Sequence, residues 1–306
     1  MLHWVTREDC EMSRLSKIKK SVSEQIFGPP RFCAETCLVS DELRVVYAYI
    51  PKSACTSVKT WLLRYGGFLP TIARQYDEAE ARGEEGPDAH TVMSEQFALR
   101  RRSPAEIERV LSDPSYFKFT VVRHPLRRLV SAYLDKVVKV KSPAYNVIIS
   151  GQVAAGCLST GNLVNWLRGL PLDRERSLTF REFVASLPKQ RLENLDAHFR
   201  EQDRLLRGIE FDLVGKLENL VQDFAAIQRH LNVSTPLPMR NSGDYAIAEV
   251  AECVADWPAA QFRLGKVAPW HRFYDEALLS ECERFYAKDF ARFGYECRLP
   301  EQRRVA

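Results

Sequence analysis

A polar loop that carries one cation and several hydroxyls is the first group of residues suited to chemistry. It follows the apolar run 43–50 and reads Pro51-Lys52-Ser53-Ala54-Cys55-Thr56-Ser57. The lysine supplies positive charge, the small side chains allow close approach, and the three hydroxyls can donate hydrogen bonds. This combination suits a phosphate or a sulfate group. An ordinary strand-to-helix turn is the competing interpretation.

A second set of anion-binding side chains lies further along the chain. Arg123 directly follows the β-type run 117–122, and Ser131 comes eight residues later. In a helix that begins after Arg123, Ser131 lies about two turns in, on a face that the guanidinium can approach. An arginine fork and a serine hydroxyl together could bind one phosphate. The alternative is that Arg123 forms a surface ion pair.

The elements that must position both loops alternate between strand and helix. The runs 43–50 and 117–122 are continuously apolar, as in strands buried on both faces, and each precedes a polar loop and an apolar stripe at helical spacing. A weaker third repeat has a strand over Phe211–Val214, a turn at Gly215-Lys216 and a helix after it. This alternation predicts an α/β fold with a parallel sheet, whose ligands bind where strands end and helices begin. The segments 143–200 and 278–293 are predicted to be mostly helical.

Composition excludes several classes of protein. A net charge of +4 over 306 residues is too small to indicate nucleic-acid binding. The chain has no apolar run of membrane-spanning length and no signal-peptide pattern, so we expect a soluble, cytoplasmic protein without stable membrane insertion. The soluble lumenal part of a membrane-anchored protein would look similar. Cys33 and Cys37 are the one close cysteine pair and lack further ligands at zinc spacing, so no metal site is expected.

The two loops and their flanking elements resemble a known family. Residues 50–59 (IPKSACTSVK) are similar to the 5′-phosphosulfate loop of carbohydrate sulfotransferases, and residues 117–133 (FKFTVVRHPLRRLVSAY) to their 3′-phosphate motif. The nearest group contains the chondroitin 4-O-sulfotransferases and their bacterial relatives, and the segments 211–220 and 285–295 fit it too. The resemblance implies a P-loop-like three-layer sandwich with a central parallel sheet, helix-rich insertions and a helical C-terminus. We expect an N-terminal extension over 1–40 and a single domain over 41–300.

The resemblance also implies a reaction and the residues that perform it. Such enzymes move a sulfuryl group from 3′-phosphoadenosine-5′-phosphosulfate (PAPS) to a hydroxyl and release PAP. By this resemblance Lys52 contacts the bridging oxygen of PAPS, and the 3′-phosphate is held by Arg123 and Ser131. The 5′-phosphate is cradled by Ser53, Ala54, Cys55, Thr56 and Ser57. One departure is His124, where the group usually has an acidic residue; the change could alter the pairing around Arg123.

Transfer to a hydroxyl also needs a base for the acceptor proton, and histidine is the residue type that most often serves. His90 lies between the two motifs, where related enzymes place a catalytic histidine. His198 is the rival candidate, in a segment that resembles the family's acceptor cleft. His90 is the preferred candidate for the base, and His198 is the alternative.

Two other classes of function compete with a sulfotransferase. One is another transferase or kinase that uses a phosphate-bearing donor with an atypical P-loop; the missing Walker A pattern counts against it. The other is a non-catalytic glycan-binding protein, against which the intact Lys52, Arg123 and Ser131 count. The expected partner is a carbohydrate or another hydroxyl-bearing acceptor. Neither the sulfated position nor an oligomeric state is predicted.

Overall fold

A computed structural model describes residues 33–138, 178–188, 195–237, 246–247, 250–264 and 266–300. Its central sheet has the order β1-β2-β3-β4, and β2, β3 and β4 are parallel whereas β1 is antiparallel to β2. The four strands are β1 (Cys37–Ser40), β2 (Val45–Ala48), β3 (Phe117–Val122) and β4 (Leu213–Lys216). A small separate pair is formed by β5 (Ala246–Ile247) and β6 (Lys266–Val267).

The central strands are buried on both faces, because alternate side chains point to opposite sides. Val45 and Tyr47 of β2 pack into one apolar core, and Val46 and Ala48 pack into another. Tyr47 also stacks on Phe119 of β3, with ring centroids 4.8 Å apart. This two-sided burial explains why the run reads as continuously apolar rather than alternating.

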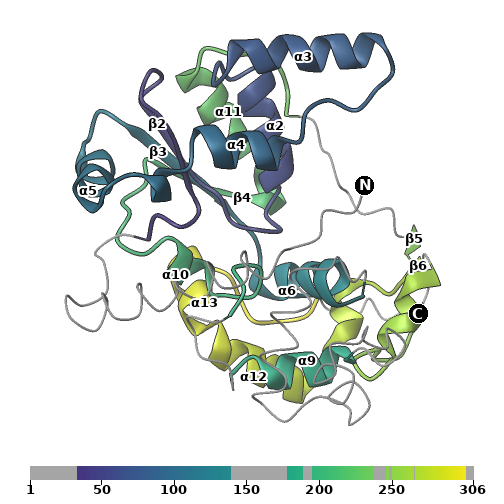
Figure 1. Ribbon diagram of the computed structural model, residues 1–306. Helices are drawn as coiled ribbons and strands as arrows, with labels where there is room; N and C mark the ends of the chain where they lie inside the picture. Colours follow the sequence, from purple (N-terminus) through teal and green to yellow (C-terminus); the bar gives the residue numbers. More distant parts are fainter. Residues whose placement is uncertain are drawn as a thin grey trace, which may run out of the picture.

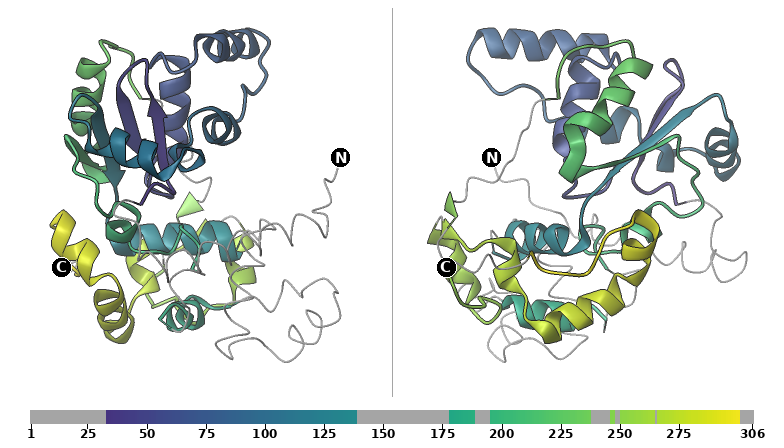
Figure 2. Two further views of the ribbon diagram at one scale, coloured as in Figure 1. Left: turned by 60° about the vertical axis from the view of Figure 1, so that its left-hand side comes forward. Right: turned by 180° about the vertical axis from the view of Figure 1, so that it is seen from behind.

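Helices cover both faces of this sheet and complete three layers (Figures 1 and 2). One face is covered by α2 (Cys55–Arg64), α3 (Pro70–Ala81), α4 (Ala89–Gln96) and α11 (Leu220–His230). The opposite face is covered by α5 (Pro104–Ser112), α10 (Gln202–Leu205) and α13 (Ala287–Phe293). The predicted class, an α/β three-layer sandwich around a mainly parallel sheet with a helical C-terminus, is therefore confirmed.

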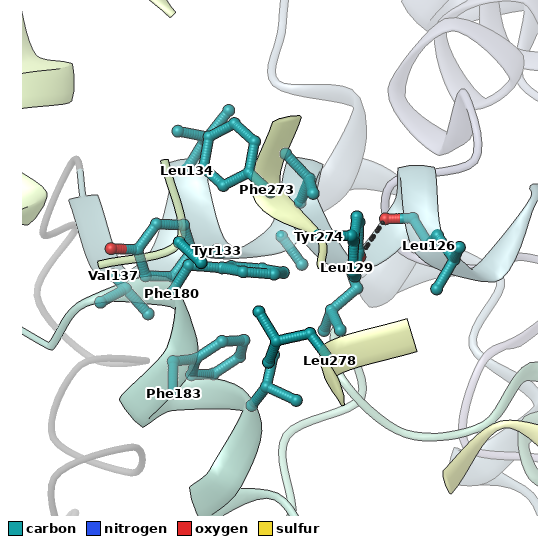
Figure 3. Packing of buried hydrophobic residues seen from close by; sticks show 14 of the residues in the cluster. Leu126, Leu129, Tyr133, Leu134, Val137, Phe180, Phe183, Phe273, Tyr274 and Leu278 are labelled. Atoms are coloured by element: carbon teal, nitrogen blue, oxygen red, sulfur yellow. Dashed lines mark hydrogen bonds between the residues drawn. The ribbon is translucent and has the colours of Figure 1, made fainter. Parts of the chain in front are cut away.

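A further group of helices, separate from the three layers, lies beyond the carboxyl ends of the parallel strands (Figure 1). It consists of α6 (Pro125–Tyr133), the π-helical turn η2 (Leu134–Val138), α9 (Phe180–Ser186), η5 (Ala259–Leu264), η6 (Trp270–Phe273) and α12 (Glu276–Phe285). Tyr133 lies in its core, where the side chain is fully buried and the hydroxyl donates to the Leu178 carbonyl at 2.8 Å. Tyr274 donates to the Leu126 carbonyl at 2.8 Å in the same core (Figure 3). This packing fixes α6, and with it the loop that carries Arg123.

Two local predictions need correction. Strand β1 lies inside the range 1–40 assigned to an N-terminal extension, so the sheet begins at Cys37. The third strand is shifted: Gly215 and Lys216 belong to β4 and do not form a turn, because both pair with β3. Residues 1–32 and most of 143–200 lie outside the described residues, so an extension before β1, a single domain after it and the helical prediction for 143–200 stay predictions. None of the described helices has the length and apolarity needed to cross a membrane.

Candidate active site

The loop between β2 and α2 has an unusual backbone. Lys52 and Ala54 adopt left-handed conformations with φ of 69° and 56°, although neither is glycine. Such conformations cost on the order of 1–3 kcal/mol each and are concentrated at ligand-binding sites. No side chain caps the N-terminus of α2, and the buried Ser53 hydroxyl has no hydrogen-bond partner among the described residues. The loop thus presents a helix N-terminus and a hydroxyl donor that an anion would satisfy.

The second predicted loop lies against the first, as expected for the ends of neighbouring parallel strands. Arg123 Nη1 donates to the Lys52 carbonyl at 3.0 Å. The backbone of Arg123 is held by Gln202, whose amide accepts from Arg123 N and donates to Arg123 O, both at 2.9 Å. Burial of the guanidinium lowers the pKa of Arg123 to about 10, so it stays charged at neutral pH. The guanidinium of the second motif therefore lies against the backbone of the first loop.

A carboxylate from another element, Glu218, contacts His124, the position where an acidic residue was expected from the resemblance. His124 N donates to Glu218 Oε1 at 3.0 Å, and the hydroxyl of Tyr295 donates to Glu218 Oε2 at 2.8 Å. Glu218 follows β4, and its charge raises the pKa of Arg123 against the effect of burial. Ser131 is half-buried in the last turn of α6, and no hydrogen bond joins it to Arg123 in the part of the chain described.

Lys52 points toward the π-helical turn that follows α6. Its ammonium lies 3.2 Å from Asp135 Oδ2, and the Lys136 ammonium lies 3.6 Å from the same oxygen. Burial lowers the pKa of Lys52, while the charge of Asp135 acts in the opposite direction. The lysine is thus held close to a carboxylate that the sequence had not singled out.

His90 contacts the first loop directly, from the first turn of α4, where Asp88 is the N-cap. Its Nε2 lies 2.9 Å from the Thr56 hydroxyl, and its Nδ1 lies 3.1 Å from the Lys59 ammonium. An ammonium can only donate, so Nδ1 accepts and Nε2 carries the proton. Partial desolvation and the charge of Lys59 lower the pKa of His90 to about 4. Both ring nitrogens are therefore already engaged.

His198 has a different arrangement. Its Nδ1 lies 2.6 Å from Asp196 Oδ1, and its backbone N donates to the same oxygen at 2.8 Å. A carboxylate only accepts, so Nδ1 carries the proton and Nε2 keeps its lone pair. Burial lowers the pKa of His198, and the nearby Lys136 and Lys52 lower it further against the effect of Asp196. This is a neutral imidazole, oriented by a carboxylate, beside the lysine of the first loop.

Arg128 ties the loop of Lys52 to the loop of His198. Its side chain is 1% exposed, and its guanidinium donates to three carbonyls: Pro51 at 3.0 Å, Arg200 at 2.8 Å and Ala197 at 2.8 Å. Pro51 precedes Lys52, and Ala197 precedes His198. One buried side chain thus fixes the distance between the two loops.

The predicted site residues come together, and further residues join them. The structure brings His90, His198, Lys52 and Arg123 to one region at the carboxyl edge of the sheet. Sequence reasoning missed Lys59, Asp135, Lys136, Asp196, Arg128 and Gln202. Asp196, two residues before His198, was the one with a readable signal, because an aspartate at that spacing often bonds the backbone two residues on. Lys216 and Glu218 both contact the segment 294–295.

Comparisons with known proteins identify the family of this chain. Residues 35–296 match the profile of the sulfotransferase family. Carbohydrate sulfotransferase 14 of Danio rerio is 29% identical over 198 residues, covering 62% of this chain and 46% of that protein. Carbohydrate sulfotransferase 11 of Rattus norvegicus is 29% identical over 202 residues, covering 64% and 53%, respectively. Carbohydrate sulfotransferase 8 of Mus musculus is 27% identical over 230 residues, covering 72% and 47%.

The chain spans about half the length of the curated relatives it matches. The family profile nevertheless covers β1 through the segment after α13, including both loops and both histidines. The resemblance seen in the two loop motifs is thereby confirmed.

Proposed function

Because this chain belongs to the sulfotransferase family, we propose that it transfers a sulfuryl group from PAPS to a hydroxyl of a carbohydrate and releases PAP. The observation that carries the proposal is the contact between Arg123 Nη1 and the Lys52 carbonyl at 3.0 Å. It sets two anion-binding loops side by side, as a donor with a 5′-phosphosulfate and a separate 3′-phosphate requires.

Each of the two loops is assigned a different phosphate group of the donor. The 3′-phosphate is assigned to Arg123 and Ser131. The 5′-phosphate is assigned to the N-terminus of α2 and residues 53–57, where the Ser53 hydroxyl gains a partner that none of the described residues supplies. Lys52 reaches the bridging oxygen between phosphorus and sulfur. Each group in the loops thus has a role that the chemistry of PAPS can satisfy.

The reaction is an in-line displacement at sulfur. The acceptor oxygen forms a bond to sulfur while the bond from sulfur to the bridging oxygen breaks. The electron pair of that bond goes to the leaving phosphate of PAP, where the Lys52 ammonium and the α2 N-terminus stabilise the new charge. The acceptor proton passes to a base.

We assign the base to His198 rather than to His90. His198 Nε2 keeps its lone pair because Asp196 fixes the proton on Nδ1. His90 Nδ1 accepts from Lys59, and its Nε2 donates to Thr56, so neither nitrogen is available. In this assignment His90 positions the donor loop through Thr56 and does not take a proton.

A carbohydrate acceptor is supported by the relatives named above as carbohydrate sulfotransferases. A cytoplasmic location stays a prediction from the sequence, to be checked by fractionation of the producing cells. So does the absence of nucleic acid among the partners.

The test is turnover of PAPS with a panel of neutral and acidic oligosaccharides, followed by mass spectrometry of the acceptor. We expect a sulfated product with at least one carbohydrate, and its loss in Lys52→Ala. Transfer of phosphate from ATP would instead favour a kinase with an atypical P-loop. Glycan binding with no turnover of either donor would favour a non-catalytic binding protein.

A further inference from the structure

Asp135 is a charged residue next to Lys52 that the proposed reaction leaves without a role. Its Oδ2 lies 3.2 Å from the Lys52 ammonium, and both side chains are 23% exposed. An ion pair at this degree of burial is screened less than one at the surface. The pairing also places a carboxylate beside the proposed site of an anionic donor. Because like charges repel, this carboxylate opposes donor binding unless it has a function toward Lys52.

The backbone places Asp135 there by departing from the α-helix. The helix α6 ends at Tyr133, and residues Leu134–Val138 continue it as a π-helical turn. Such turns are rare and often occur at functional sites. Asp135 and Lys136 both belong to this turn and reach the vicinity of Lys52.

Lys52 is surrounded by groups of both signs. In the part of the chain described, four side chains interact with the charge of Lys52. They are Cys55 of α2, Asp135 and Lys136 of η2, and His198 of the loop before α10. Burial and Lys136 lower the pKa of Lys52. Asp135 raises it through both its charge and its hydrogen bond. Asp135 therefore favours the charged form of Lys52, whereas burial disfavours it.

We propose that Asp135 is a positioning residue for Lys52, holding its ammonium charged and fixed beside the donor loop before PAPS binds. An ammonium has three N–H donors, so Lys52 can keep Asp135 and still reach the bridging oxygen of the donor. The inference rests on the proposed function for its catalytic consequence. The electrostatic consequence, the charge state of Lys52, can be measured without any donor.

The first experiment titrates Lys52 directly. Lysine side chains are labelled by reductive ¹³C-methylation, and the Lys52 signal is identified by its loss in Lys52→Arg. Asp135→Asn should move the titration of this signal to lower pH by about one pH unit, since an opposite charge at this distance typically has at least that effect. Asp135→Glu should stay close to wild type. The control Asp113→Asn breaks a similar pair, with Arg44 at 2.7 Å, at the C-terminus of α5 and should change nothing.

The second experiment follows the pH dependence of kcat/KM for PAPS, which reports groups of the free enzyme. In Asp135→Asn the alkaline limb should move to lower pH by about the same amount, and Asp135→Glu should restore it. A purely structural role would lower activity equally at every pH. An unchanged Lys52 titration in a folded Asp135→Asn protein would overturn the inference, whereas absence of PAPS turnover in wild type would overturn the proposed function.

Discussion

Replacing His198 separates the two candidate bases. His198→Ala removes the neutral imidazole whose Nε2 has no hydrogen-bond partner among the described residues, and we expect kcat to fall by about 10²–10⁴-fold, the usual contribution of a general base. PAP affinity should change little, because His198 contacts Asp196 rather than the donor loop. His90→Ala removes one hydrogen bond to the donor loop, worth about 0.5–1.5 kcal/mol. That corresponds to an increase in the Kd for PAP of about two- to tenfold.

The pH dependence gives an independent signature of the same base. Burial lowers the pKa of His198 from its ordinary value of 6.5, so kcat/KM should rise with pH along an acid limb centred below pH 6.5. Asp196 raises the pKa of His198, because its carboxylate favours the charged ring. Asp196→Asn should therefore move the acid limb to still lower pH and also lower kcat, because the ring is no longer oriented.

The assay is steady-state turnover of PAPS from pH 5 to 9, with calorimetric binding of PAP at each variant. His230→Ala is a suitable control, since His230 stacks on Phe117 with ring centroids 4.0 Å apart and contacts neither loop. A loss of 10²-fold or more in His90→Ala, with only a small loss in His198→Ala, would refute the assignment and give the role of base to His90.

Three further predictions concern the network and the core around the site. Lys59→Met should raise the pKa of His90 from about 4, because the ammonium disfavours the charged ring; an unchanged ring titration by NMR would contradict this. Arg128→Met leaves three carbonyls without their donor, so we expect the free energy of unfolding in denaturant to fall by about 2–4 kcal/mol and kcat to fall as well. The half-buried neighbour gives the control, Arg127→Met. If Arg128→Met lowers the free energy of unfolding no more than this control does, Arg128 does not hold the two loops together. Tyr133→Ala should cost about 3–5 kcal/mol of unfolding free energy; a value near zero would contradict the packing in Figure 3.

The adjacency of the two loops could be predicted from the sequence, because the carboxyl ends of neighbouring parallel strands meet at one edge of a sheet. Lys52 and Arg123 each follow a strand with a strong β-type pattern, and β2 pairs directly with β3. The sequence favours His90 as the base, whereas we assign His198 from the contacts of the two rings. That choice depends on which side chains face each ring, here Lys59 and Asp196, and these contacts form only in the folded chain.

Three other features could not be predicted from the sequence, each for a physical reason. The position of Asp135 depends on a π-helical turn, which has no sequence periodicity distinct from that of α6. Arg128 lies in a run of basic residues, and nothing in that run distinguishes a buried guanidinium from exposed ones. Strand β1 has only four residues and is antiparallel, so it carries no strand–loop–helix signature.

Calorimetric binding of PAP and ATP to the wild-type protein and to Arg123→Ala tests the donor site most directly. We predict that PAP binds more tightly than ATP and that Arg123→Ala weakens PAP binding by about ten- to hundredfold, equivalent to about 1.5–3 kcal/mol for hydrogen bonds to a charged phosphate. Absence of PAP binding, or equal affinity for ATP, would contradict a PAPS site at these two loops.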